Sequence, residues 1–456
     1  MLEKTLKKLG NVFLLVMSLG FYAWGEPRFV PIMIGSIIFN YALAIAIDRL
    51  RHMKALSKAL LIFCVAGNLG LLVTYKYLDF IIDNINLFGL GLPAANIVLP
   101  LGISFFTFQA MSYVIDVYRG DVPVQKKPHY VGLYISFFPQ LIAGPIVRYS
   151  TIKEQIENRC VTFEQFGEGV KRFLVGFSKK MLLANNMALI ADRAFAMPDA
   201  ERSVVYAWIG AIAYTFQLLF DFSGYSDMAI GLGKMFGFRF LENFNYPYMS
   251  KSISEFWQRW HISLGKWFRD YVYFPLGGSR VKSKARLVIN LFVVWTLTGA
   301  WHGASWNFIL WGALYFVLIV FEKLTGCPKK FKSSFAINLY RAFTLLCIIG
   351  GRVLFRAADI KAAVKYGLSM FGLRGNAIFS ADVIVAFREY WVFLIAAALC
   401  STELFVHIRA YLDNSAGRNL RIAANALTVG VYVFFFFWAV SFIILGSHNP
   451  FIYFNF

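Results

Sequence analysis

The segment Trp295-Thr-Leu-Thr-Gly-Ala-Trp-His-Gly-Ala-Ser-Trp-Asn-Phe308 sets a histidine between two glycines in a long apolar part of the chain. Apolar runs at 287–301 and 304–322 lie on either side of His302. Each is close to the length of a helix that crosses about 30 Å of hydrocarbon. An ionisable side chain at that depth is costly and is therefore a functional hypothesis by default. The segment predicts a membrane protein with chemistry at His302.

The composition of the whole chain points the same way. Of its 456 residues, 59% are hydrophobic and only 15% are charged, whereas soluble globular proteins are roughly 45–50% apolar and about 25% charged. These values exclude a disordered chain, a secreted disulfide scaffold and an ordinary cytosolic enzyme. The net charge of +20 is interpreted as cytoplasmic loops rich in Lys and Arg, because no DNA- or RNA-binding motif favours nucleic acid.

Apolar runs recur along the chain, and Gly or Pro interrupts several of them. We expect an all-α polytopic membrane protein with about ten to twelve membrane helices, some of them re-entrant or amphipathic. Basic residues before the first run and between the second and third predict a cytoplasmic N-terminus. No linker or repeat divides the chain, so residues 1–456 are expected to form a single membrane domain. The runs lie near 10–24, 29–48, 57–79, 96–117, 131–147, 168–192, 203–236, 287–301, 304–322, 336–354, 390–411 and 423–446.

Residues 237–286 differ from their surroundings because they combine many aromatic side chains with many basic ones. Ser252-Ile-Ser-Glu255 has the capping-box pattern that opens a helix. We therefore expect one amphipathic helix that lies in the membrane interface or packs beneath the bundle. Its apolar stripe recurs at helical spacing and consists of Trp257, Trp260, His261, Leu264, Phe268 and Tyr271.

Two of the six histidines are candidates for chemistry. His302 is either a catalytic group at membrane depth or a buried histidine satisfied by a neighbouring carbonyl. His261 is either packed in the core or a catalytic partner. Neither has a carboxylate or cysteine at ligand spacing, so no metal site is expected; a neutral imidazole suits proton transfer from a hydroxyl. The remaining four histidines have solvated or interfacial contexts: His52, His129, His407 and His448.

The sequence lacks the motifs of several other classes of enzyme. The sequence contains no Gly-x-x-x-x-Gly-Lys phosphate loop, no Gly-x-Gly-x-x-Gly and no Gly-x-Ser-x-Gly, so ATP, dinucleotide and acyl-serine chemistry are unsupported. The five cysteines include no Cys-x-x-Cys and are expected to be small core residues. Asp221 and Asp227 lie in an apolar run, where they either hydrogen-bond a broken helix or line a polar pathway.

These segments together resemble the membrane-bound O-acyltransferase family, specifically its bacterial alginate O-acetylase-like branch. The resemblance extends over about residues 11–456. Where relatives commonly carry a further apolar segment, only about ten residues precede the first run, and the expected cytoplasmic N-terminus fits this departure. The strongest matches are 254–278, which begins Ser-Glu-Phe-Trp-Gln-Arg-Trp-His, and 299–308; supporting matches are 21–27, 99–108, 137–145, 221–227, 352–356 and 450–456.

The resemblance implies a ring of membrane helices around a thinned centre, in a multi-pass protein of the bacterial cytoplasmic (inner) membrane. It implies that His302 is catalytic and that His261 is the second characteristic polar position. We expect an acetyl group to move from a cytoplasmic thioester, acetyl-CoA, towards a hydroxyl on an extracytoplasmic polysaccharide. No bound cofactor is expected, and an extracytoplasmic esterase-like partner is implied.

Within this hypothesis His302 is the general base, and His261 binds or orients the acyl group. Arg259 and Lys266 either attract the phosphates of CoA or form a solvated basic face. Two rival functions stay open: D-alanyl transfer to teichoic acid, and non-catalytic transport of an acyl donor or lipid-linked sugar. Only the transporter should tolerate His302→Ala. The residues expected to bind substrate are Trp301, Trp257, Trp260, Arg259 and Asn307.

Overall fold

Helices are the regular secondary structure of the part of the chain that the structure describes. The structure is a computed structural model and describes residues 2–415, 417–445 and 450–452. Within these residues there are α-helices, short 3₁₀ and π segments, and no strand. Among the described residues, seven helices are long and apolar enough to cross a membrane, which confirms the all-α polytopic class. They are Pro27–Arg49, Lys54–Asn86, Val204–Met235, Trp306–Thr325, Ser334–Arg356, Ala381–Cys400 and Asn419–Ile444.

The chain divides into two compact units, residues 1–170 with 229–241 and residues 171–228 with 242–456. The elements of the first unit are α1 (Leu2–Gly25), η1 (Pro27–Phe29), α2 (Val30–Arg49), α3 (Lys54–Leu72), η2 (Val73–Tyr77), α4 (Leu78–Asn86), α5 (Ile103–Arg119), α6 (Pro128–Ser136) and α7 (Tyr149–Asn158). Two helices contribute residues to both units: α8 (Phe163–Ser178) and α10 (Val204–Met235).

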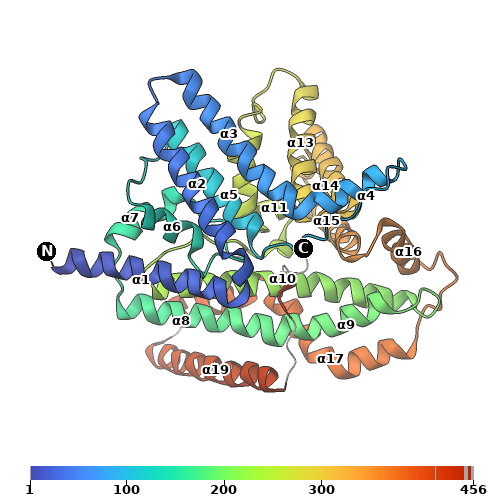
Figure 1. The fold of residues 1–456 in the computed structure, drawn as a ribbon. Helices are drawn as coiled ribbons and strands as arrows, with labels where there is room; N and C mark the ends of the chain where they lie inside the picture. Colours follow the sequence, from blue (N-terminus) through green and yellow to red (C-terminus); the bar gives the residue numbers. More distant parts are fainter. Residues whose placement is uncertain (1, 416, 446–449, 453–456) are drawn as a thin grey trace. The chain divides into compact units, whose positions relative to one another are not determined.

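The second unit carries all the candidate site residues. Its α13, α14 and α15 lie side by side (Figure 1). The elements are η3 (Lys179–Ala184), α9 (Asn185–Ala196), η4 (Pro247–Met249), α11 (Ile253–Arg259), α12 (Ile262–Phe268), η5 (Arg269–Tyr273), α13 (Lys284–His302), α14 (Trp306–Thr325), α15 (Ser334–Arg356), α16 (Ile360–Met370), α17 (Ala381–Cys400), α18 (Leu404–Ser415) and α19 (Arg418–Ile444).

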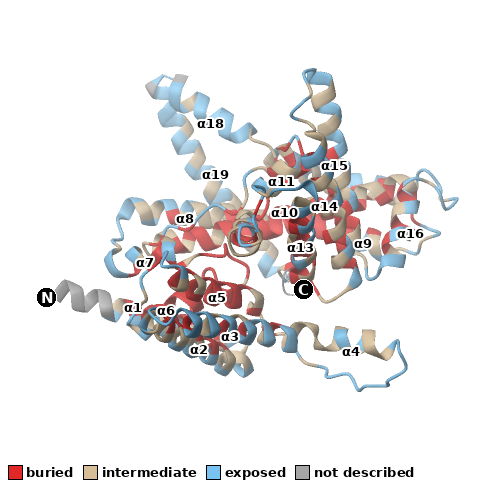
Figure 2. Ribbon diagram, turned by 90° about the horizontal axis from the view of Figure 1, so that it is seen from above, coloured by how far each residue is buried: buried red, intermediate tan, exposed pale blue. Residues whose placement is uncertain are grey.

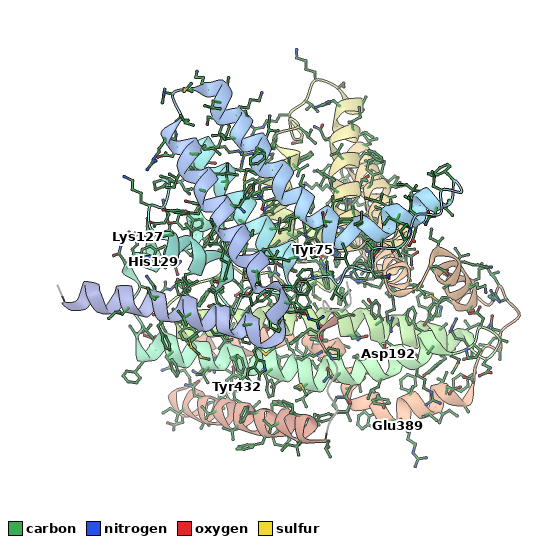
Figure 3. The ribbon with its side chains drawn as sticks, in the orientation of Figure 1. Tyr75, Lys127, His129, Asp192, Glu389 and Tyr432 are labelled. Atoms are coloured by element: carbon green, nitrogen blue, oxygen red, sulfur yellow. The ribbon has the colours of Figure 1, made fainter. Side chains whose placement is uncertain are left out.

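Within the first unit, apolar helices are joined by buried amides. Asn40 of α2 and Asn68 of α3 exchange side-chain hydrogen bonds of 3.1 and 2.9 Å, so neither amide is left unsatisfied in an apolar interior. The run expected at 131–147 is helical only to Ser136, because a helix seldom continues into the residue before a proline, here Pro139. His129 lies in the first turn of α6, and Figure 3 labels it beside Lys127.

Burial differs sharply among the long helices (Figure 2). In the most apolar window of α10, 67% of the residues are buried, against 6% in α19. An apolar helix exposed in this way suits contact with lipid. The apolar run expected at 390–411 is not one helix, because residues 401–403 separate α17 from α18. His448 and residues 453–456 of the C-terminal motif lie outside the described residues.

The carboxylates of α10 do not cap a broken helix, since α10 is continuous over 32 residues. Asp227 instead pairs with Arg172, at 2.6 Å, and with Lys179, at 2.7 Å. Asp221 forms an ion pair with Lys180, and both side chains are almost fully buried. These contacts give both negative charges a partner within an apolar environment, as buried charges require.

A helical hairpin of α13 and α14 positions His302. A Cβ added at Gly299 would lie 2.4 Å from the carbonyl oxygen of Phe308. A Cβ added at Gly312 would lie 2.5 Å from the carbonyl oxygen of Trp295. Only glycine permits two backbones to approach so closely, as at small-residue interfaces between membrane helices. His302 is the last residue of α13. The glycine contact therefore fixes its position against the start of α14.

Candidate active site

The expected amphipathic helix is two short helices rather than one. The capping box is confirmed at its start, where Ser252 accepts a hydrogen bond of 3.1 Å from the Glu255 N–H. However, α11 ends at Arg259 and α12 begins at Ile262, with His261 in the left-handed conformation at φ 46°. Such a conformation costs roughly 1–3 kcal/mol for a residue other than glycine and clusters at functional sites. The break therefore marks His261 as a constrained position.

Asn243 holds the break in place from a separate loop. Its backbone carbonyl accepts from the Ile262 N–H at 2.9 Å, and its side-chain oxygen accepts from the Ser263 hydroxyl at 2.8 Å. The same oxygen lies 3.3 Å from Nδ1 of His261. Because an amide oxygen only accepts, Nδ1 is assigned as the donor, and Nε2 carries the lone pair. His261 can thus accept a hydrogen bond from a substrate hydroxyl.

The His261 imidazole is only 1% exposed. Its ring packs against Phe222, with centroids 4.7 Å apart, and lies parallel to Phe244 at 6.5 Å. Burial in these apolar surroundings lowers the pKa of His261 from its ordinary value to about 3. The ring therefore stays neutral near pH 7 and is better suited to orienting a group than to holding a proton.

His302 lies in an aromatic enclosure and is 5% exposed. Its ring centroid is 5.0 Å from that of Trp301, 4.9 Å from that of Trp311 and 5.4 Å from that of Phe355. These rings come from α13, α14 and α15 respectively. Three helices thus surround the imidazole with side chains that exclude water, where electrostatic interactions are strengthened.

Trp301 joins the two histidines. Its ring centroid lies 5.9 Å from that of His261 and 5.0 Å from that of His302. The structure therefore brings together two residues that are 41 positions apart in the sequence. Both imidazoles therefore contact the same indole.

The other predicted tryptophans occupy different parts of the cluster. The Trp257 ring packs against those of Trp311 and Tyr315, with centroids 5.4 and 4.9 Å apart. Since Trp311 contacts His302, Trp257 reaches His302 only through that ring. Trp260 is 3% exposed and lies under the guanidinium of Arg352, 4.1 Å from the ring centroid. Trp260 is thus buried against other side chains, whereas Trp257 is only partly buried.

Two predicted binding residues have protein partners. Arg259 forms ion pairs with Glu255, at 3.0 Å, and Glu403, at 3.2 Å, so its charge is already balanced by carboxylates. The Asn307 amide donates a hydrogen bond of 2.7 Å to the Ala357 carbonyl, which follows the end of α15. This bond ties α14 to α15 close to His302.

Sequence reasoning missed Glu322, a buried carboxylate in α14. It accepts hydrogen bonds from the N–H groups of Ile253 and Ser254, at 2.7 and 2.8 Å, and from the Tyr340 hydroxyl at 3.1 Å. A carboxylate at a helix N-terminus satisfies donors that the helix itself leaves unpaired. Glu322 therefore anchors α11, which carries Trp257. An acidic residue inside an apolar run was the signal that could have identified it.

The C-terminal segment contributes to a second buried cluster in this unit. The Ile452 N–H donates to Asp221 at 2.9 Å, and the Lys180 ammonium lies 3.3 Å from the Pro450 carbonyl and 4.7 Å from the centre of the Phe451 ring. These contacts give the Lys180 and Asp221 side chains further hydrogen-bond partners, and they hold residues 450–452 against the buried ion pair. Among the described residues, no three His, Cys, Asp or Glu side chains gather where they could hold a metal ion.

Comparison with known proteins identifies the family. The model of the membrane-bound O-acyltransferase (MBOAT) family matches residues 101–327. A probable alginate O-acetylase, AlgI, of Pseudomonas putida is 37% identical over 98% of this chain and 94% of its own length. The corresponding protein of Pseudomonas syringae is 42% identical, over 79% of this chain and 70% of its own. A peptidoglycan O-acetyltransferase of Helicobacter pylori is 36% identical over 80% of this chain and 74% of its own length.

The chain belongs to the membrane-bound O-acyltransferase family, as its motifs indicated. It is a multi-pass membrane protein and an O-acyltransferase. The hypothesis of a non-catalytic transporter is set aside, because the relatives that match most of the chain are named as acetylating enzymes.

Proposed function

We propose that this protein moves an acetyl group from acetyl-CoA, at the cytoplasmic face of a bacterial inner membrane, to a hydroxyl on an extracytoplasmic polysaccharide. The acetyl group is the element that the names of the alginate and peptidoglycan relatives share. Both of those acceptors carry sugar hydroxyls, which are nucleophiles that an imidazole can activate. The transfer needs no resident cofactor, because the thioester already supplies an activated acyl group.

The observation that carries the proposal is that the imidazoles of His261 and His302 both pack against the Trp301 ring. His302 takes the proton of the accepting hydroxyl as its oxygen attacks the thioester carbonyl carbon. The carbon–sulfur bond then breaks, and the departing thiolate receives that proton from His302. His261, which burial keeps neutral, accepts a hydrogen bond that orients the accepting hydroxyl before its proton passes to His302.

Aromatic side chains form the walls of the proposed reaction space. Trp301 contacts both imidazoles, Trp257 packs against Trp311, and Trp260 packs against Phe244. We propose that Arg259 meets the phosphates of CoA by exchanging an ion pair with Glu255 or Glu403 for one with phosphate. Asn307 would act through the position of α15, because its amide bonds the Ala357 carbonyl.

An extracytoplasmic esterase-like protein is the proposed partner. It would complete the transfer to the polymer, and a serine of that partner would then be the hydroxyl that His302 activates. The polymer can be alginate-like, peptidoglycan or another surface polysaccharide. All of these share an acceptor hydroxyl on the side of the membrane opposite to the CoA donor.

Measurement of the esters on the surface polymer tests this proposal. A strain that lacks the protein is complemented with wild type, His302→Ala or His407→Ala, at equal membrane levels. His407 is a matched control because its side chain is 76% exposed on α18. We expect acetyl esters with wild type and His407→Ala and none with His302→Ala. Esters of D-alanine in place of acetate would favour the teichoic acid alternative, and full acetylation by His302→Ala would refute the mechanism.

A further inference from the structure

Arg352 is a buried cation without a counter-ion. It lies in α15 and is only 1% exposed. No carboxylate among the described residues pairs with it, and its Nε and Nη2 atoms donate to no acceptor there. A buried charge that lacks a partner costs several kcal/mol even after relaxation, so it is retained where a ligand supplies the partner.

The surroundings of Arg352 offer donors but few acceptors. Its guanidinium lies over the Trp260 ring. The Tyr315 hydroxyl is fully buried and has no hydrogen-bond partner among the described residues. It lies against the backbone next to Arg352, since a Cβ at Gly351 would be 2.7 Å from it. Burial raises the pKa of Tyr248 to about 12, so that neighbouring hydroxyl stays neutral and cannot balance the charge. A cluster of this kind is complementary to an anionic oxygen.

The cluster adjoins His302. Phe355 follows Arg352 by three positions, on the same face of α15, and its ring packs against His302 at 5.4 Å. Trp311 makes the second link, because its ring is 4.9 Å from that of His302 and 5.1 Å from that of Tyr315. Arg352 and Tyr315 are thus separated from His302, the proposed base, by a single layer of aromatic side chains.

The two unpartnered nitrogens of Arg352 have a specific geometry. Nε–H and Nη2–H lie along one edge of the planar guanidinium and point in nearly the same direction. That edge can direct two hydrogen bonds at a single charged group. In thioester chemistry next to His302, negative charge develops on the acyl oxygen, whereas the phosphates of CoA are held away from the sulfur by the pantetheine arm.

We propose that Arg352, with the Tyr315 hydroxyl, binds the acyl carbonyl oxygen and stabilises the negative charge that it carries in the tetrahedral intermediate. This inference rests on the acyl transfer proposed above. When the hydroxyl oxygen bonds to the carbonyl carbon, its proton goes to His302 and the carbonyl π electrons move to the oxygen beside Arg352. When the intermediate collapses, the C=O bond re-forms, the C–S bond breaks and the thiolate takes the proton from His302.

The test compares variants of Arg352 and Tyr315 in inside-out membrane vesicles that contain the full chain. The vesicles receive radiolabelled acetyl-CoA, and label is measured as alkali-labile ester on polymer. Loss of preorganised donors to an oxyanion lowers kcat by about 10²–10³-fold. We expect that loss for Arg352→Met, with KM for acetyl-CoA changed less than about threefold, because the charge develops only in the transition state. Arg352→Lys, which keeps the charge without the paired donors, should be intermediate, and Tyr315→Phe should lose about tenfold.

Arg356→Met is the matched control, since Arg356 lies on the same helix and pairs at 2.8 Å with Asp192, which Figure 3 labels. It should keep kcat within about twofold. The thermal midpoint of Arg352→Met should equal or exceed that of wild type, because the substitution removes a buried charge without a partner. An unchanged kcat, a rise in KM alone, or full activity of Arg352→Lys would overturn the inference. A wild type that transfers no label from acetyl-CoA would instead refute the proposed donor, on which the inference depends.

Discussion

Alanine at Gly299 should displace His302 without touching it. A Cβ at this position would lie 2.4 Å from the Phe308 carbonyl oxygen and 3.3 Å from the Gly312 Cα. Both atoms belong to the backbone and cannot rotate away. To restore ordinary contact, α13 and α14 would have to separate by about 1 Å, because packed interiors do not absorb extra volume. His302, three residues further along α13, would move with the helix.

The size of the effect follows from this overlap. Overpacking of an interior costs about 1–3 kcal/mol, and a 1 Å displacement of a reacting group lowers turnover about 100-fold. Alanine also stabilises a helix by up to about 1 kcal/mol relative to glycine. Gly350→Ala supplies a control that shares this gain, because Gly350 lies inside α15 and an added Cβ would meet no atom within 4 Å.

Both variants are compared with wild type by thermal unfolding in detergent and by ester formation in vesicles supplied with acetyl-CoA. We expect Gly350→Ala to match or exceed the wild-type midpoint with unchanged turnover. Gly299→Ala should unfold at a lower temperature and turn over about 100-fold more slowly. Equal stability and turnover of the two variants would refute the close packing of α13 on α14.

Three further predictions concern buried charges and pH. Removal of the Glu322 carboxylate by Glu322→Ala leaves two N–H groups of α11 unpaired and should lower unfolding free energy by about 3 kcal/mol, measured by thermal unfolding. Asp221→Asn leaves Lys180 without its counter-ion and should cost about 3–5 kcal/mol in the same assay, most of which the double variant Asp221→Leu, Lys180→Met should recover. The pKa of His261 is lower in the folded protein than in the unfolded chain, so the unfolded state binds more protons as the pH falls. The free energy of unfolding should therefore decrease below about pH 6.5, by about 2 kcal/mol at pH 5. His261→Gln should remove that pH dependence.

Each of these predictions has a result that would contradict it. Glu322→Ala with wild-type stability would show that the carboxylate does not anchor α11. A double variant as unstable as Asp221→Asn alone would show that the lost charge pair is not the cause. An unchanged slope of stability against pH in His261→Gln would assign the titration to another group.

The sequence predicted those features that depend on neighbours along the chain. The apolar runs identified the membrane class, Ser252 and Glu255 identified the start of α11, and His302 was recognised because one ionisable residue lay between glycines in an apolar run. The spacing also placed Trp260 and Leu264 on one apolar stripe, and both side chains are buried. In each case the physical cause lies within a few residues.

The remaining features depend on residues that are distant in sequence. The break at His261 is held by Asn243, 18 positions away, which bonds His261 and the first residues of α12. The spacing of apolar side chains carries no information on a hydrogen bond to a distant residue. That spacing therefore predicted one continuous helix. Arg352 was noticed only as part of a motif, because its lack of a counter-ion becomes visible only when the helices are packed.

The most direct test of the account compares His302→Gln with His261→Gln in vesicles supplied with radiolabelled acetyl-CoA. Glutamine keeps much of the hydrogen-bonding capacity of histidine but cannot take up a proton at neutral pH. Loss of a general base costs about 10²–10⁴-fold in rate. We predict that loss of kcat for His302→Gln and a smaller loss for His261→Gln, which retains an acceptor for orientation. Ester formation by His302→Gln at the wild-type rate would contradict the central claim that His302 activates the hydroxyl.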